Sequence, residues 1–82
     1  MPLRRRVLLL LEESIASLEA MASSSEPLEP RKLGRLFSDL RSLHRSMIRL
    51  EKTGAKSRQR FWRMQRRAVI LIVRIAKHLS TS

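Results

Sequence analysis

The 82-residue chain contains no cysteine and no tyrosine, and it has only two glycines and three prolines. Without cysteine, a disulfide framework, a thiolate metal site and a cysteine nucleophile are excluded. The few glycines and prolines, with one tryptophan and two phenylalanines, disfavour a fold rich in strands and tight turns. Apolar residues make up 43% of the chain, which suits a packed helical unit better than a disordered basic tail.

Acidic residues are also scarce, because seven Asp and Glu are set against 18 Lys and Arg. The formal net charge is therefore +11 with neutral histidines. A chain of this length forms one small domain, and such a domain repels itself when it carries this much charge. We therefore expect a polyanionic partner or surface that balances the charge.

Long hydrophobic runs are missing as well. The apolar stretches at residues 7–11 and 68–73 fall far below the roughly 20 residues that a membrane-spanning helix needs. The basic start of the chain resembles a signal peptide, but its apolar run ends at Glu12 and no clear cleavage site follows. These patterns predict an intracellular protein, cytoplasmic or nuclear, with neither a signal peptide nor a transmembrane helix.

Two breaks divide the chain into three segments. The connector at 23–30 is polar and ends in Pro30, which suits the first turn of a helix. Gly54 is placed to end the second segment, and Ser57 can cap the third. The sequence predicts a single helical domain over residues 1–82, with helices at about 3–22, 30–53 and 57–79.

Each segment has apolar residues at alternating spacings of three and four, which we call a seam. The seams consist of Leu8, Leu11, Ile15, Leu18 and Ala22; of Leu33, Leu36, Leu40, Leu43, Met47 and Leu50; and of Phe61, Gln65, Ala68, Ile72, Ile75 and Leu79. Seams are typical of helices that pack nearly antiparallel, so we expect an all-α, three-helix antiparallel bundle. Further apolar residues beside the seams predict that a homodimer completes the core. They are Val7, Leu9, Leu10, Ile70 and Leu71.

The basic residues follow helical periodicity too, on the sides of the helices away from the seams. Repeated arginines with small serines between them suit contacts to phosphate groups. The predicted nucleic-acid-binding residues are Arg31, Arg35, Ser38, Arg41, Arg45, Arg49, Lys52, Lys56, Arg60, Arg63 and Arg67. The row on the third helix continues to Arg74 and Lys77. Arginines at 4–6 and 31, near helix starts where the macrodipole disfavours cations, support the expectation of a polyanion.

No catalytic or cofactor site is predicted. The two glycines are isolated, so no phosphate-binding loop is present, and the two histidines lack cysteine or acidic companions at metal-ligand spacing. We expect His44 to pack or to contact the backbone, and Glu12 and Glu13 to pair with arginines across the bundle. The protein is therefore expected not to be an enzyme, to hold no cofactor or metal, and to take no small-molecule substrate.

Trp62 stands next to Phe61 at apolar spacing with Val69 and Ile72, so we expect it in the core rather than stacked on bases. Without an exposed aromatic platform, duplex nucleic acid is favoured over single strands. The absence of asparagine and the scarcity of glutamine remove the usual adenine-reading side chains, so little sequence specificity is expected.

Three helices of about 20 residues with a basic second helix resemble two viral modules. One is the nodavirus silencing suppressor, and the other is the RNA-binding domain of the influenza non-structural protein. Both are all-helical homodimers that lay paired basic helices along double-stranded RNA without reading its sequence. The resemblance covers the architecture of residues 3–79 and implies RNA contacts at Arg35, Ser38, Arg41, Arg45 and Arg49.

The role that this resemblance implies is that of a viral accessory protein, which sequesters double-stranded RNA from host RNA silencing or innate sensing. A third helix as basic as the second departs from the viral pattern and leaves open which helix makes the contact.

Two other functions stay open. The arginines at 63, 66, 67 and 74 flank the apolar stretch 68–73, a pattern typical of a peripheral helix on an anionic membrane surface. The leucine seams also suit a helical adaptor that docks on an acidic protein partner.

Overall fold

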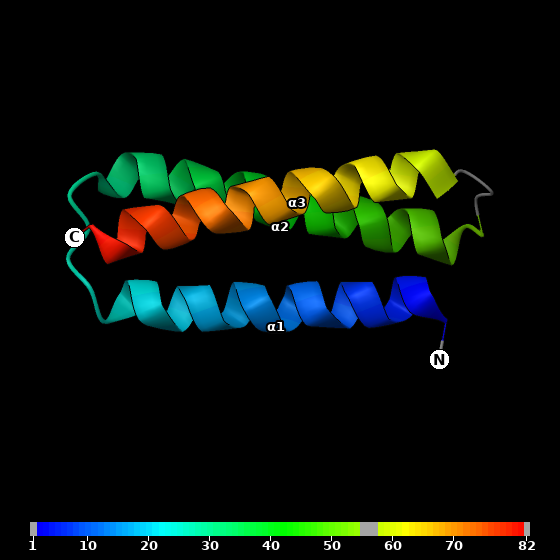
Figure 1. Cartoon of the computed structure of the whole chain (residues 1–82), viewed down its shortest axis with the longest axis horizontal. Coiled ribbons are helices and arrows are strands. Elements are labelled where there is room, and N and C mark those ends of the chain that lie inside the picture. The colour runs from blue at the N-terminus through cyan, green and yellow to red at the C-terminus, as the bar shows by residue number, and fades with distance from the viewer. Residues whose placement is uncertain (1, 55–57, 82) are drawn as a thin grey trace.

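A computed structural model describes residues 2–54 and 58–81, which form three α-helices. Helix α1 spans Leu3–Ser23, α2 spans Pro30–Lys52 and α3 spans Arg58–Ser80. The helices lie along the long axis of a molecule whose principal extents are 41 × 20 × 15 Å, and α2 runs antiparallel to both α1 and α3 (Figure 1). The predicted all-α three-helix bundle is confirmed.

The ends of the helices follow local signals in the sequence. Pro30 is the first residue of α2, where its missing N–H costs nothing. Gly54 follows α2 with a φ of 65°, and its N–H donates a hydrogen bond to the Glu51 carbonyl at 3.2 Å. The cap predicted at Ser57 lies outside the described residues.

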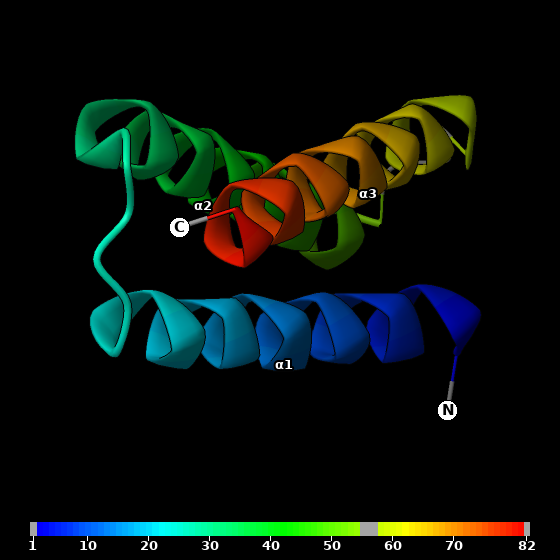
Figure 2. The same cartoon turned by 60° about the vertical axis from the view of Figure 1, so that its left-hand side comes forward.

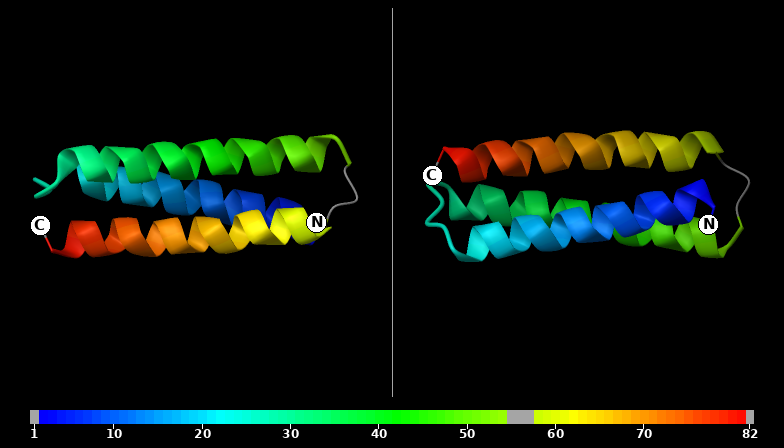
Figure 3. Two further views of the ribbon diagram at one scale, coloured as in Figure 1. Left: turned by 90° about the horizontal axis from the view of Figure 1, so that it is seen from above. Right: turned by 60° about the horizontal axis from the view of Figure 1, so that its bottom comes forward.

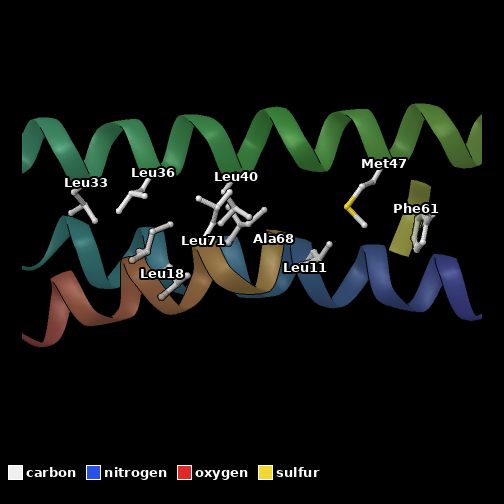
Figure 4. Packing of buried hydrophobic residues seen from close by; sticks show 11 residues of the cluster. Leu11, Leu18, Leu33, Leu36, Leu40, Met47, Phe61, Ala68 and Leu71 are labelled. Carbon is white, nitrogen blue, oxygen red and sulfur yellow. The ribbon is translucent and has the colours of Figure 1, made fainter. Parts of the chain in front are cut away.

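Eleven buried hydrophobic residues from all three helices form the core (Figure 4). They are Leu11, Ile15, Leu18, Leu33, Leu36, Leu40, Met47, Phe61, Ala68, Leu71 and Ile75. All except Leu71 belong to the predicted seams. Leu40, Met47, Phe61 and Ile75 are fully buried, so the seam residues of α2 and α3 meet at the centre of the bundle.

The prediction that Leu71 lies outside the seam of α3, where a second copy would cover it, is wrong, because this side chain is buried within the bundle. The core positions of α3 follow the alternative spacing 61, 64, 68, 71 and 75, so that Leu71 rather than Ile72 is buried. Gln65 and Ile72, placed in the predicted seam, are therefore only half-buried. Among the other residues expected beside the seams, Leu9, Leu10 and Ile70 are exposed, and Val7 is half-buried against the core.

The middle helix makes most of the contacts between elements. Contact between α2 and α3 is the most extensive, and contact between α1 and α3 is the least. In Figure 2, α1 forms a separate layer beneath the other two helices, and both views in Figure 3 show the three helices side by side along their length. The packing between helices is therefore least extensive on the side between α1 and α3.

Ion pairs join the start of α1 to the end of α2. The Nε atoms of Arg4 and Arg5 lie 3.3 Å and 4.0 Å from the two carboxylate oxygens of Glu51. The guanidinium of Arg4 also lies over the Phe61 ring, 5.4 Å from its centroid. Glu51 thus offsets the unfavourable position of both arginines at a helix N-terminus, so these two residues give no independent support for a polyanionic partner.

The core makes a direct prediction about stability. Leu40→Ala should lower the free energy of unfolding by about 2–5 kcal/mol, because it leaves a cavity in the middle of α2 where a fully buried leucine was packed. Urea denaturation followed by circular dichroism measures this loss.

The control variant is Leu28→Ala, because Leu28 lies in the connector between α1 and α2 and is 78% exposed. It should change the free energy of unfolding by less than about 0.5 kcal/mol. Equal losses in the two variants would contradict the described core.

Candidate nucleic-acid interface

The basic arc predicted on α2 lies on its solvent-exposed surface. The predicted site residues Arg31, Arg35, Ser38, Arg41, Arg45, Arg49 and Lys52 are all exposed. The buried residues of the same helix, among them Leu33, Leu36 and Leu40, lie on its other side, against the rest of the bundle. Burying the leucines therefore fixes the basic side of α2 toward solvent. Lys56 lies outside the described residues.

The basic row of α3 is exposed in the same way. Arg60, Arg63 and Arg67 are exposed, and so are Arg74 and Lys77 at the far end of the helix. Helix α3 packs more extensively on α2 than on α1. The basic rows of α2 and α3 can therefore contact one ligand together only if both lie on the same side of this helix pair.

A shallow groove between α2 and α3 brings the two basic helices together. Its lining residues are Ser46, Arg49, Leu50, Thr53, Arg60 and Met64. Arg49 from the last turn of α2 and Arg60 from the first turn of α3 thus lie beside one opening. We call this opening, together with the junction of α2 and α3 on the same side of the bundle, the α2/α3 groove.

Further arginines continue both edges of the groove. Residues seven apart lie on nearly the same side of a helix. Arg35 and Ser42 precede Arg49 at this interval, and Arg67 and Arg74 follow Arg60 at it. Because α2 and α3 are antiparallel, the two stripes run along the same junction from opposite directions. The groove arginines are Arg35, Arg49, Arg60, Arg67 and Arg74.

The charge along this junction is strongly positive. Arg31 and Arg63 lie at the borders of the two stripes, close in sequence to Arg35 and Arg60. An exposed carboxylate, Asp39, lies one turn after Arg35 on α2 and partly offsets the positive charge there. The structure therefore places Arg35, Arg49, Arg60 and Arg67, four of the predicted site residues, along one surface.

The remaining predicted residues lie on the other side of α2, toward α1. Ser38, Arg41 and Arg45 line depressions between α1 and α2 that also contain the carboxylates of Glu12 and Glu19. Lys52 follows Arg45 at an interval of seven and continues this side. This surface mixes both signs of charge, unlike the stripes along the α2/α3 groove.

Arg41 is already paired within the protein. Its Nε donates a hydrogen bond to Glu19 Oε1 at 3.2 Å, and its Nη2 donates to Glu19 Oε2. Such a two-point contact occupies the guanidinium donors that a phosphate would need. This pair cannot be read from the sequence, because the two residues are distant in the chain and meet only when α1 packs on α2. Arg41 is therefore a weaker candidate for anion binding than the groove arginines.

The acidic residues of α1 contribute differently from the prediction. Glu19, rather than Glu12 or Glu13, supplies the carboxylate that joins α1 to an arginine of α2. Glu12 is exposed and lines the same depression as Arg45.

His44 contacts the backbone, as the sequence predicted. Its Nε2 lies 3.1 Å from the carbonyl oxygen of Leu8, so the tautomer with a proton on Nε2 donates a hydrogen bond to α1. The half-buried ring thus helps to hold α1 against α2, so the role of His44 is structural.

The prediction that Trp62 packs in the core is wrong. Phe61 is fully buried, whereas Trp62 is 38% exposed and meets the Phe61 ring edge-on at 5.1 Å between centroids. Adjacent residues of a helix point in directions about 100° apart, so with Phe61 at the centre of the core Trp62 points to the edge of the buried side. Trp62 lies with Arg58, Arg63 and Arg66 in a shallow depression on α3.

Residues 2–54 and 58–81 contain no group of three or more His, Cys, Asp or Glu side chains that could hold a metal ion. Within the same ranges, no helix is long and apolar enough to cross a membrane. No protein-family model, curated protein or solved structure matches the chain.

The pairing of Arg41 with Glu19 makes a second prediction. A double-mutant cycle with Glu19→Ala and Arg41→Ala should give a coupling energy of about 0.2–1 kcal/mol, because both side chains are partly exposed and solvent screens their attraction. Urea denaturation of the four proteins measures the coupling. A coupling energy of zero would show that the pair does not stabilise the fold.

Proposed function

We propose that this protein binds double-stranded nucleic acid, with duplex RNA as the preferred form, and that it contacts the phosphate backbone without reading sequence. The observation that carries the proposal is the pair of arginine stripes along the α2/α3 groove. Guanidinium groups bind phosphate oxygens at two points, so a row of them suits a repeating phosphate backbone.

The dimensions of the helices support this partner. The 23 residues of α2 make a helix about 34 Å long at ~1.5 Å per residue, which is close to one turn of a nucleic-acid duplex. Arginines recur at intervals of about two helical turns on α3 and about four turns on α2, and they would meet phosphates along the backbone without requiring a contact to any base. Binding of this kind depends on charge and shape and tolerates any sequence.

The choice of a duplex over a single strand follows from the aromatic residues. Single-strand binders stack successive bases on several exposed rings. Of the two phenylalanines and one tryptophan, Phe61 is fully buried, Phe37 is half-buried, and Trp62 is only partly exposed. One exposed ring can stack one base, so the arginine stripes carry the interaction.

The preference for RNA over DNA rests on the architectural resemblance to the nodavirus suppressor and to the influenza RNA-binding domain. An all-helical bundle with basic helices on its surface agrees with that resemblance. In this reading the protein is a viral accessory factor that sequesters double-stranded RNA from host silencing or innate sensing.

A membrane surface is the second candidate partner, since Val69, Ile70 and Val73 are exposed on α3 close to Arg66. It requires apolar residues to enter lipid, whereas the proposed function requires only the arginines. Flotation with anionic and neutral vesicles separates the two. A nucleic-acid binder should not float with the vesicles once duplex is added, whereas a membrane-binding protein should still float with anionic vesicles.

Two matched triple variants test the proposed function. Arg49→Ala/Arg60→Ala/Arg67→Ala removes three charges from the α2/α3 groove, and Arg41→Ala/Arg45→Ala/Lys52→Ala removes three from the side toward α1. Fluorescence anisotropy with a labelled RNA duplex over a series of salt concentrations measures both affinity and its salt dependence.

For the wild type, log K should fall steeply with log[salt], by about 0.7–0.9 for each neutralised phosphate. The groove variant should lose up to about three such units and most of its affinity, whereas the matched variant should retain more of both. Circular dichroism should show that all three proteins remain helical.

Equal losses in the two variants would mean that only net charge matters and that the α2/α3 groove has no special role. An unchanged affinity in both, or a flat salt response in the wild type, would overturn the proposed function. Parallel titrations with duplex DNA, single-stranded RNA and a duplex of unrelated sequence test the stated preference.

A further inference from the structure

Two helices carry a second set of residues at alternating spacings of three and four, outside the core. On α1 the set consists of Leu3, Val7, Leu10, Ser14, Ser17 and Met21, and on α3 of Trp62, Arg66, Val69, Val73, Ala76 and Ser80. We call these the outer seams. Leu3, Leu10 and Met21 are 53–63% exposed, and the three large apolar members on α3 are 38–46% exposed.

The outer seam of α1 lies on the side of that helix away from α2. The side of α1 in contact with α2 carries the Leu8 carbonyl, which His44 contacts, and Glu19, which pairs with Arg41. The outer seam is on the opposite side of α1. Leu10 is about 160° around the helix from Leu8 at 100° per residue, which places the outer seam on the α3 side.

The outer seam of α3 is arranged in the same way. Arg60 and Met64 face α2 in the α2/α3 groove. Val69 and Val73 lie on the opposite edge of α3 by the same periodicity, which is the edge toward α1. Both outer seams therefore border one side of the bundle, between α1 and α3, where contact between helices is least extensive. We call this side the α1/α3 face.

We propose that the α1/α3 face binds a second copy of this chain in a symmetric homodimer. Single exposed apolar residues are ordinary on a protein surface, but six large ones on one side of a small bundle are not. The spacing of three and four matches what a packed helix presents, and the serines and the alanine let two helices approach closely. A lipid surface would accept the same spacing but would disfavour the serine hydroxyls within the seams.

The distribution of charge favours a second copy over other occupants. Two chains with a net charge of +11 each repel one another, so they can associate only where few charges meet. Arg66 is the one charged residue in the outer seams. An acidic partner would gain little from a face with one arginine, whereas an identical, mainly apolar face is complementary to it in a two-fold arrangement.

The size of the face also agrees with a dimer. The two longer extents of the molecule, 41 and 20 Å, bound a face of the order of 800 Å², which leaves room for the area that one partner contributes to a stable interface. Joining two copies there leaves the groove arginines exposed, because they border the other side of α3. The inference is therefore independent of the proposed function, although a dimer would present two such surfaces to one duplex.

Charged substitutions with closely matched controls test the dimer. Leu10→Glu/Val69→Glu places charges in both outer seams. Leu9→Glu/Ile70→Glu makes the same change at neighbouring residues of similar exposure, which lie off the face. Light scattering over a dilution series gives the mass, and circular dichroism confirms that the variants are folded.

We expect the wild type and the Leu9/Ile70 variant to show about twice 9.6 kDa, and the Leu10/Val69 variant to dissociate at least ~100-fold more readily. The single tryptophan supplies a second readout, since Trp62 lies in an outer seam. Its emission should shift to longer wavelength when the wild type is diluted, but not when the Leu10/Val69 variant is diluted.

A monomeric wild type at the highest concentration, or equal dissociation of the two variants, would overturn the proposal. A monomer that floats with anionic vesicles and loses this property in the Leu10/Val69 variant would assign the face to lipid instead. RNA titrations of the same proteins keep the two proposals separate: a wild-type dimer without affinity for RNA refutes only the proposed function, and an RNA-binding monomer refutes only the dimer.

Discussion

The packing of the leucines of α2 against both neighbouring helices is the interaction on which the rest of the structure depends. Leu40 and Met47 are fully buried, and they hold α2 between α1 and α3. Because α2 buries its leucine side against α1 and α3, its opposite, basic side is exposed to solvent. It also sets the junction with α3, where the second stripe of arginines lies.

The fold could be predicted because each helix carries local information. Pro30 and Gly54 mark the ends of α2, and the seam residues repeat at the spacing of a packed helix. The predictions of burial are wrong where two sets of apolar residues on one helix both have the spacing of a core. On α3, the spacings through Leu71 and through Ile72 both suit a core, and only the position of α2 decides that Leu71 is buried. Trp62 was misplaced for the same reason.

The candidate site was only partly accessible from the sequence. Helical periodicity placed the basic residues on the surface, but it could not relate one helix to another. That Arg49 and Arg60 border one groove, and that Arg41 is paired with Glu19, depends on which helix faces which. These tertiary contacts divide one predicted set of residues into a groove with few acids and a side where charges are mixed.

The distribution of arginines and apolar residues gives the bundle two distinct surfaces that share α3. The central claim is that polyanions bind at the α2/α3 groove and not at the α1/α3 face. Amide chemical shifts in ¹H–¹⁵N NMR spectra, recorded while an RNA duplex is added, test it most directly. We expect shifts along the groove, at Arg35, Ser42, Arg49, Arg60 and Arg67. Shifts confined to Leu10, Met21 and Val73, or no shifts at all, would contradict it.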